Sequence, residues 1–64
     1  MDYGKRIKEI RERQGMTQVE LSQKSGISQE HISRIENGKF IPNVKTADKL
    51  AQAMGVKLID ILKE

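Results

Sequence analysis

Apolar residues recur at helical spacing along the whole chain, and glycines interrupt the pattern about once per short helix. No stretch alternates apolar and polar residues over the length of a β-strand. Because glycine adopts the left-handed backbone conformation at little cost, a glycine directly after an apolar-periodic run predicts the end of a helix. The pattern therefore predicts an all-α fold with five short helices, at about residues 3–14, 17–25, 28–37, 43–54 and 58–63.

Side chains with an oxygen acceptor stand before four of the five predicted helices. Such residues accept a hydrogen bond from the first turn and stabilise the start of a helix. The segment TQVE, residues 17–20, has the spacing of a capping box, in which the Thr17 hydroxyl and the Glu20 carboxylate each bind the other's backbone amide. Lys57 precedes the fifth helix and offers no acceptor. The predicted caps are Asp2, Thr17, Ser28 and Asn43.

Each predicted helix has one apolar face, and together these faces predict a compact aliphatic core. A chain of 64 residues makes one domain, predicted as 1–64, whose small core leaves little margin of stability. It has no cysteine, so disulfides cannot add to that margin. One further apolar residue, Ile59, falls outside the face of its helix and is expected at the surface. The predicted core residues are Tyr3, Ile7, Ile10, Leu21, Ile27, Ile32, Ile35, Val44, Ala47, Leu50, Ala51, Met54, Leu58, Ile61 and Leu62.

Composition argues against several classes of protein. Without cysteine, and with His31 as its one histidine, the chain is not expected to bind a metal ion. No nucleophile has a nearby base in the sequence, so we expect neither an enzyme nor a cofactor. There is no signal peptide, no membrane-spanning length of apolar residues and no room for a domain that senses a small molecule. We therefore expect a cytoplasmic protein, and its net charge of +3 leans mildly toward a polyanionic partner.

The second and third predicted helices are joined by a tight turn around Gly26, and the third is polar and exposed. That arrangement predicts a helix-turn-helix over residues 17–37. The segment TQVELSQKSGISQEHISRIENGK closely resembles the helix-turn-helix of the Cro and lambda-repressor-like regulators, the XRE family. The resemblance extends to IKEIRERQGMTQ before it and to IPNVKTADKLAQAMGVKLIDIL after it, and so covers nearly the whole chain. It implies a lambda-repressor-like DNA-binding domain, with Ser22 standing where the family usually has alanine.

The third predicted helix has the chemistry of a recognition helix. In this motif the helix enters the major groove and its N-terminal half faces the base edges. Gln pairs with adenine, Arg pairs with guanine, and Glu accepts from the cytosine amine. The alternative is a solvated face on which Glu30 and Arg34 form an ordinary ion pair one turn apart, and both can hold if the pair opens on DNA. The predicted base-reading residues are Ser28, Gln29, Glu30, Ser33 and Arg34.

Phosphate contacts are implied by the resemblance on both sides of that helix. Gln18 opens the second helix, whose free amides suit an anion, and it is also expected to support Gln29. His31 is expected at the edge of the recognition helix, facing phosphate or solvent. Gln18 can instead be a plain surface residue, and Asn37 can do no more than end its helix. The predicted phosphate-binding residues are Arg11, Gln18, His31, Asn37, Lys39 and Phe40, the last through its backbone.

An acidic residue near the end of the third predicted helix needs compensation. Glu36 lies in the last turn, where its charge opposes the helix dipole. In the family a basic residue of the first helix supplies the partner, and Arg11 is the matching position. We therefore predict a partly buried Arg11–Glu36 ion pair whose role is mainly structural, with the guanidinium also directed toward phosphate.

These features predict a sequence-specific, double-stranded DNA-binding transcriptional regulator at the nucleoid. We expect a repressor that acts by occupying a two-fold symmetric operator as a homodimer. The dimer is expected to use the last two helices, with Ile59 near its axis and the recognition helices about 34 Å apart. The alternative is a protein-interaction module with the same fold, either a bridging factor or a partner binder of the antitoxin type.

Overall fold

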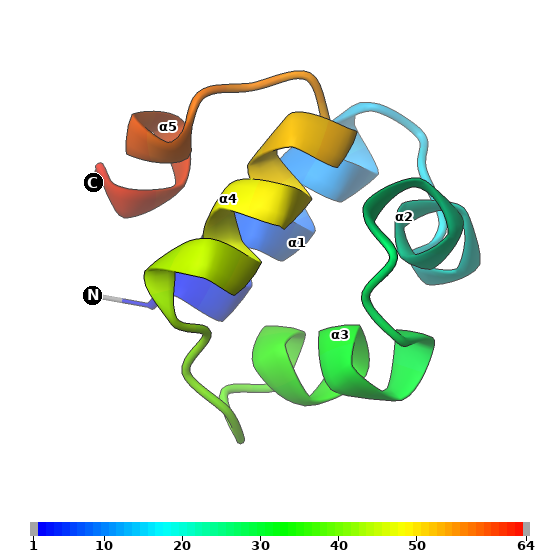
Figure 1. The fold of residues 1–64 in the computed structure, drawn as a ribbon, viewed down its shortest axis with the longest axis horizontal. Helices are drawn as coiled ribbons and strands as arrows, with labels where there is room; N and C mark the ends of the chain where they lie inside the picture. The colour runs from blue at the N-terminus through cyan, green and yellow to red at the C-terminus, as the bar shows by residue number, and fades with distance from the viewer. Residues whose placement is uncertain (1, 64) are drawn as a thin grey trace.

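Five α-helices, joined by short loops, lie within residues 2–63, the part of the chain that the structure, a computed structural model, describes (Figure 1). Each observed boundary lies within one residue of its prediction, and the all-α fold is confirmed. The predicted domain, 1–64, extends at each end by one residue that lies outside the described range. The helices are α1 (Tyr3–Arg13), α2 (Gln18–Ser25), α3 (Gln29–Glu36), α4 (Val44–Ala53) and α5 (Leu58–Leu62).

The predicted caps form, and they explain why the helices begin where they do. The side-chain oxygens of Asp2, Ser28 and Asn43 each accept from the backbone amide three residues further on, at 2.8–3.1 Å. The capping box of α2 is complete, with the Glu20 amide donating to the Thr17 hydroxyl and the Thr17 amide to the Glu20 carboxylate. The hydrogen bond from the Thr17 backbone, followed by that from its hydroxyl, lowers the pKa of Glu20 below its usual value.

The turn between α2 and α3 depends on a left-handed glycine. Gly26 ends α2 with a φ of 78°, and its amide donates to the carbonyl of Ser22. The Ile27 amide then donates to the Ser25 hydroxyl at 3.1 Å, which brings the chain directly to the cap of α3. This short connection fixes the N-terminal end of α3 beside α2.

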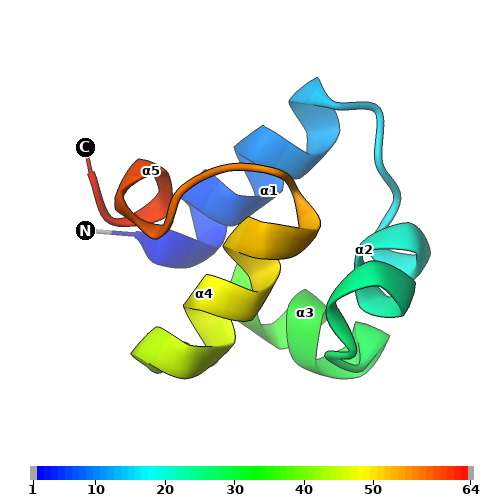
Figure 2. The same cartoon turned by 45° about the horizontal axis from the view of Figure 1, so that its top comes forward.

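The helices close around one aliphatic core to which all five contribute. Its fully buried large side chains come from every helix, and Ile27, predicted inside, is partly buried against them. α1 packs on α3 and α5, α2 packs on α3 and α4, and α4 packs on α5 (Figures 1 and 2). The first and last described residues lie on the same side of the molecule. The buried core residues are Ile7, Ile10, Leu21, Ile32, Ile35, Ala47, Leu50, Ala51, Met54 and Ile61.

One core prediction is wrong. Val44 was expected inside, but its side chain is 66% exposed. It is the first residue of α4, and helical side chains lean toward the N-terminus of their helix. The first turn of α4 projects past the other helices, so this side chain extends beyond the core (Figure 2). Ile59, predicted outside, is 58% exposed.

None of the helices described is both long and apolar enough to cross a membrane.

Among the helices within residues 2–63, α5 alone begins without a side-chain cap. The Lys57 amide donates to the Asp60 carboxylate at 2.9 Å, but Lys57 itself offers no acceptor to the first turn. Lys57→Ser supplies that acceptor and should raise the free energy of unfolding by about 1 kcal/mol. Urea unfolding followed by circular dichroism measures the change. Lys57→Ala removes the same charge without adding an acceptor and should give no such gain; equal gains in the two variants would contradict the capping explanation.

Candidate nucleic-acid interface

The two faces of α3 differ sharply in burial. Ile32 and Ile35 are buried in the core, whereas Gln29, Glu30 and Arg34 are exposed. The spacing predicted this division, because residues three and four apart share one face of a helix. Ser33, also predicted on the reading face, is half-buried. The polar face of α3 is therefore directed outward.

A surface hollow of about 570 Å³ gathers most of the predicted site. Residues of α2, of α3 and of the loop that follows α3 line it together. This hollow joins predicted base-reading residues to predicted phosphate-binding residues, although the two kinds are up to 16 positions apart in the sequence, as Gln18 and Arg34 are. Its lining residues are Gln18, Gln29, Glu30, Ser33, Arg34, Asn37 and Lys39.

The ion pair weighed as an alternative on α3 is present. Arg34 Nη2 lies 3.2 Å from Glu30 Oε1, and the two side chains are 64% and 77% exposed. A pair this exposed contributes roughly 0–1 kcal/mol. Its presence therefore does not decide between a solvated face and a reading face, because opening it would cost little.

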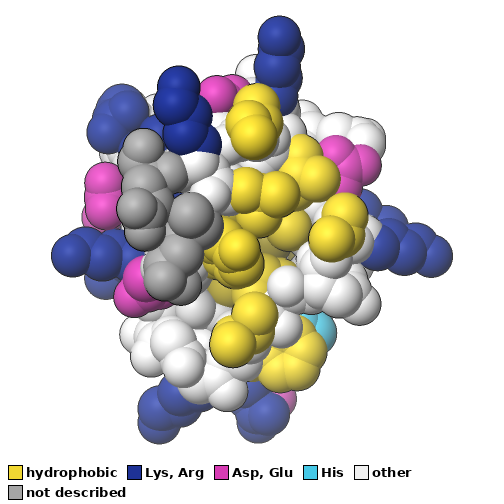
Figure 3. Space-filling model, turned by 90° about the vertical axis from the view of Figure 1, so that its left-hand side faces the viewer, with side chains coloured by type: hydrophobic (Ala, Val, Ile, Leu, Met, Phe, Trp, Pro, Cys, Tyr) yellow, Lys and Arg dark blue, Asp and Glu magenta, His cyan; other side chains and the backbone are white. Residues whose placement is uncertain are grey.

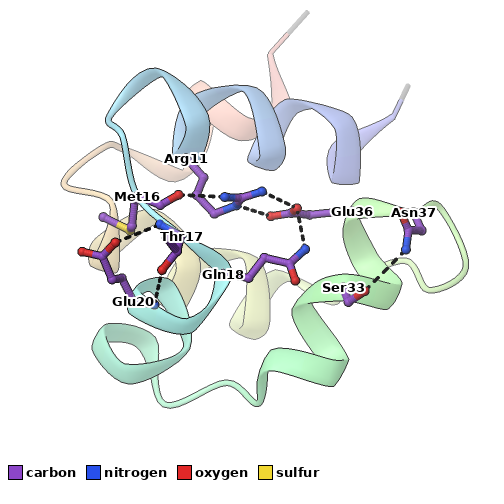
Figure 4. A network of polar contacts seen from close by, with 8 residues as sticks. All are labelled: Arg11, Met16, Thr17, Gln18, Glu20, Ser33, Glu36 and Asn37. Atoms are coloured by element: carbon purple, nitrogen blue, oxygen red, sulfur yellow. Dashed lines mark hydrogen bonds and ion pairs between the residues drawn. The ribbon is translucent and has the colours of Figure 1, made fainter.

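A buried ion pair connects α1 to the last turn of α3, as predicted. Arg11 Nε donates to Glu36 Oε2 at 2.8 Å, and Arg11 Nη2 donates to Glu36 Oε1 at 2.9 Å (Figure 4). The third guanidinium nitrogen, Nη1, donates to the Met16 carbonyl at 2.7 Å. The hydrogen bond to Glu36 raises the pKa of Arg11 above its usual value, although burial opposes the charged form.

The burial of Arg11 matters for the second role predicted for this residue, a contact with a DNA phosphate. Its side chain is 9% exposed, and each of its three guanidinium nitrogens already donates inside the protein. The predicted phosphate contact of Arg11 stays a prediction, while the predicted ion pair is confirmed.

Gln18 is attached to the same ion pair. Its Nε2 donates to Glu36 Oε1 at 3.0 Å, so α2 joins α1 and α3 in one polar network (Figure 4). Gln18 lines the hollow beside Gln29, but the contact that holds its amide is with Glu36. The position of Gln18 is thus set by the last turn of α3.

His31 packs toward the protein. Its ring meets the Phe40 ring edge to face, with centroids 4.6 Å apart, and its Nε2 is buried without a hydrogen-bond partner among the residues that the structure describes. The contact joins α3 to the loop after it. As placed, Nε2 is not available to a phosphate, and the predicted contact of His31 stays a prediction.

The backbone carbonyls at the end of α3 accept hydrogen bonds from amides of the residues that directly follow the helix. The Gly38 amide donates to Ile35 and the Lys39 amide to Arg34, at 3.1 and 2.9 Å. The Asn37 side chain donates to the Ser33 hydroxyl at 3.4 Å. No acceptor within residues 2–63 is found for the Phe40 amide, so this amide remains as a backbone donor of the loop.

The sequence comparisons agree with this geometry. The helix-turn-helix family model matches residues 7–61. The chain belongs to the XRE-type helix-turn-helix family. The family consists of DNA-binding transcriptional regulators rather than catalysts.

Three similar proteins illustrate the range of this family. The immunity repressor protein of Bacillus phage phi105 is 34% identical over 64 residues, all of this chain but 44% of that protein. The HTH-type transcriptional regulator y4dJ of Sinorhizobium fredii is 37% identical over 59 residues, covering 92% of this chain and 77% of that one. An HTH-type transcriptional regulator of Archaeoglobus fulgidus is 43% identical over 56 residues, covering 88% and 79%. This chain thus spans less than half of the phage repressor and over three quarters of the two regulators.

Three contacts of α1 and of Gln14, the residue at its C-terminal cap, were not predicted from the sequence. Arg6 Nε donates to the Asp60 carbonyl at 2.9 Å, and Gln14 Nε2 donates to the Met54 carbonyl at 2.7 Å. Gly4 is buried with its backbone against the last turn of α3. The sequence does contain a cue to the close packing at Gly4. A glycine inside a helical pattern lowers helix propensity, so its presence there usually has a packing reason.

The buried ion pair should dominate the stability of the helix-turn-helix. Glu36→Gln keeps the shape of the side chain but leaves the charge of Arg11 buried without its partner, which typically destabilises by about 3–5 kcal/mol. Thermal unfolding followed by circular dichroism should therefore show a large fall in Tm.

Glu30→Gln is the matched control on the same helix. It removes an exposed pair and should change stability by less than about 1 kcal/mol. Similar Tm values for Glu36→Gln and Glu30→Gln would refute a dominant role for the buried pair.

Proposed function

We propose that this chain binds double-stranded DNA in a sequence-specific way and represses transcription by occupying its operator. The observation that carries the proposal is the hollow in which the exposed face of α3 meets Gln18 and Lys39. The phage relative is named an immunity repressor, which supports repression over activation. Such a protein acts at the nucleoid.

Base reading is assigned to the outward face of α3. Arg34 recognises guanine, Gln29 recognises adenine, and Glu30 accepts from the cytosine amine. The Glu30–Arg34 pair opens on binding, at a cost smaller than the contact that replaces it. Ser28 and Ser33 are assigned a smaller part in base reading. Each hydroxyl already accepts a hydrogen bond within the protein, that of Ser28 from the His31 amide and that of Ser33 from the Asn37 side chain.

Phosphate binding is assigned to two sites that flank α3. At the first, the capping box uses the Thr17 and Glu20 amides, so the Gln18 and Val19 amides of α2 are the donors left for a phosphate. At the second, Lys39 supplies a charge and the Phe40 amide a donor, with Asn37 beside them.

The assembly that we propose is a homodimer formed through an apolar face. We assign to this face four apolar residues that are 45–78% exposed, Phe40, Ile41, Val44 and Ile59. Figure 3 shows hydrophobic side chains gathered on one side of the molecule, with Lys and Arg around them. A second hollow, of about 490 Å³ and lined in part by Phe40, Ile41 and Tyr3, adjoins it. A grouping of this kind is typical of a protein–protein interface.

The position of the apolar face, next to the end of α3, favours a second copy of this chain as the partner that binds there. Phe40 and Ile41 follow α3 in the chain, so a two-fold axis through this face brings the two α3 helices to one side of the dimer. Recognition helices about 34 Å apart then match successive major grooves of a two-fold symmetric operator. Ile59 lies near the axis in this arrangement.

The same apolar face favours one alternative function. A helix-turn-helix domain that binds another protein, as a bridging factor or an antitoxin-type partner, would also need an exposed apolar surface. The alternative differs in that α3 would then make no base contacts.

Selection of bound sites from a random duplex pool tests the function. We expect a half-site repeated at fixed spacing, and binding that weakens steeply as salt rises. A pool without enrichment would leave the interaction module as the better description.

Arg34→Ala should relax sequence preference at one base position, with a loss of about 1–3 kcal/mol on the selected site. Competition binding against single-base variants of that site measures the change. Lys39→Ala is the control, because loss of a phosphate contact weakens all duplexes alike and lowers the salt slope by about 1. An Arg34→Ala variant with unchanged base preference would remove this residue from the reading face.

Ile59→Ser should shift a dimer toward monomer, because each buried Ile side chain contributes about 1.5–3 kcal/mol. Sedimentation equilibrium without DNA measures the association constant. Val19→Ser replaces another exposed apolar residue, on α2, and should leave that constant unchanged. A wild-type protein that stays monomeric at high concentration would argue against the dimer.

A further inference from the structure

One glycine of α1 is required for a reason other than backbone conformation. A β-carbon at Gly4 would lie 1.8 Å from the carbonyl oxygen of Ile35, 2.7 Å from its carbonyl carbon and 3.2 Å from Cα of Glu36. Gly15 and Gly55, in contrast, have open space around the same position and a positive φ. Gly4 therefore allows direct backbone contact between the first turn of α1 and the last turn of α3.

α1 holds the last turn of α3 at two points. Gly4 meets the backbone of Ile35 and Glu36, and Arg11, seven residues later on the same face of α1, binds the Glu36 carboxylate. The backbone contact limits how closely the helices approach, and the ion pair limits how α3 turns about its axis. The other end of α3 is fixed to α2 by the short turn at Gly26.

We infer that Gly4 is a positioning residue for DNA recognition, because it sets the tilt of α3 and with it the place of the base-reading side chains. The inference rests on the sequence-specific DNA binding proposed above. With a methyl group at position 4, the Ile35 carbonyl must recede by about 1.2 Å to reach even 3.0 Å from the new carbon. Because the N-terminal end of α3 stays attached to α2, that displacement tilts the helix.

Tilting affects the two kinds of DNA contact unequally. Hydrogen bonds to base edges tolerate changes of only a few tenths of an ångström. A phosphate contact made by a long, flexible lysine adapts, and it carries no sequence information. Gly4→Ala should therefore lower the preference for the operator far more than it lowers binding to any other duplex.

The experiment compares the dissociation constants for the duplex that the wild type selects and for a scrambled duplex of the same composition. For Gly4→Ala we expect the ratio of the two Kd values to fall about tenfold or more, the equivalent of at least one good base contact. We expect Kd for the scrambled duplex to stay within about threefold of the wild type. Concentrations are those of folded protein, measured by circular dichroism.

Gly55→Ala is the matched control. It introduces the same methyl group at a φ of +70° in the α4–α5 turn, where it strains the backbone but meets no atom of α3. It should lower stability and leave the Kd ratio unchanged. If Gly4→Ala alone is too unstable to measure, the double variant with Lys57→Ser provides a stabilised background.

A second readout does not depend on DNA. The amides of Asn37, Gly38 and Lys39 donate to carbonyls of the last turns of α3, so a displaced helix end should shift their NMR signals in Gly4→Ala and not in Gly55→Ala. An unchanged Kd ratio in Gly4→Ala, or a double variant that never folds, would overturn the positioning role. A wild type without preference for any duplex would instead overturn the proposed function, and the NMR shifts would still show whether Gly4 positions α3.

Discussion

The buried Arg11–Glu36 ion pair is the interaction on which the arrangement of the helix-turn-helix depends. Removing two charges from water is expensive, and such a pair is tolerated when its geometry is good and its remaining polar atoms are satisfied. Both conditions hold here, since the pair is bidentate and the Met16 carbonyl and Gln18 amide complete it. A hydrophobic pair could fill the same space, but its contacts are not directional and would not fix how the helices are oriented. The ion pair defines how α1, α2 and α3 meet, and so where the outward face of α3 points.

The core and the polar face of α3 do not compete for the same residues, which leaves that face free for the base reading proposed here. Ile32 and Ile35 fasten α3 to the core, while the hydrogen bonds that begin and end the helix are supplied locally, by Ser28 at one end and by the amides of Gly38 and Lys39 at the other. The exposed side chains Gln29, Glu30 and Arg34 therefore contribute little to folding. They can change without loss of the fold, which suits the base-reading role proposed for them.

Local physics made most of the fold predictable, and the failures have nonlocal causes. Caps, glycine stops and helical spacing depend on residues three or four apart, so the helix bounds followed from sequence. Val44 satisfied the same spacing and still lies outside, because its burial depends on whether a neighbouring helix reaches that far. The contact of His31 with Phe40 and that of Gly4 with Ile35 join separate elements, and no periodicity encodes them. The Arg11–Glu36 pair was predicted only because family resemblance supplied the partner. The residues in the hollow beside α3 were predicted from helical spacing and from the family resemblance, whereas the contacts proposed for them depend on a partner outside this chain.

The loop after α3 connects the outward face of that helix, proposed for base reading, to the apolar face proposed for the dimer. Within a few residues the chain passes from Asn37 and Lys39, which line the hollow, to Phe40 and Ile41, which lie on the apolar face. Phe40 also contacts the His31 ring, so one aromatic side chain touches α3 and belongs to the proposed dimer surface. A shift of this loop on dimerisation would act on α3 through that contact, while the ion pair and the backbone contact at Gly4 resist the shift from the other side. In the proposed dimer, residues 37–41 are therefore the segment through which dimer formation and the setting of α3 would be linked.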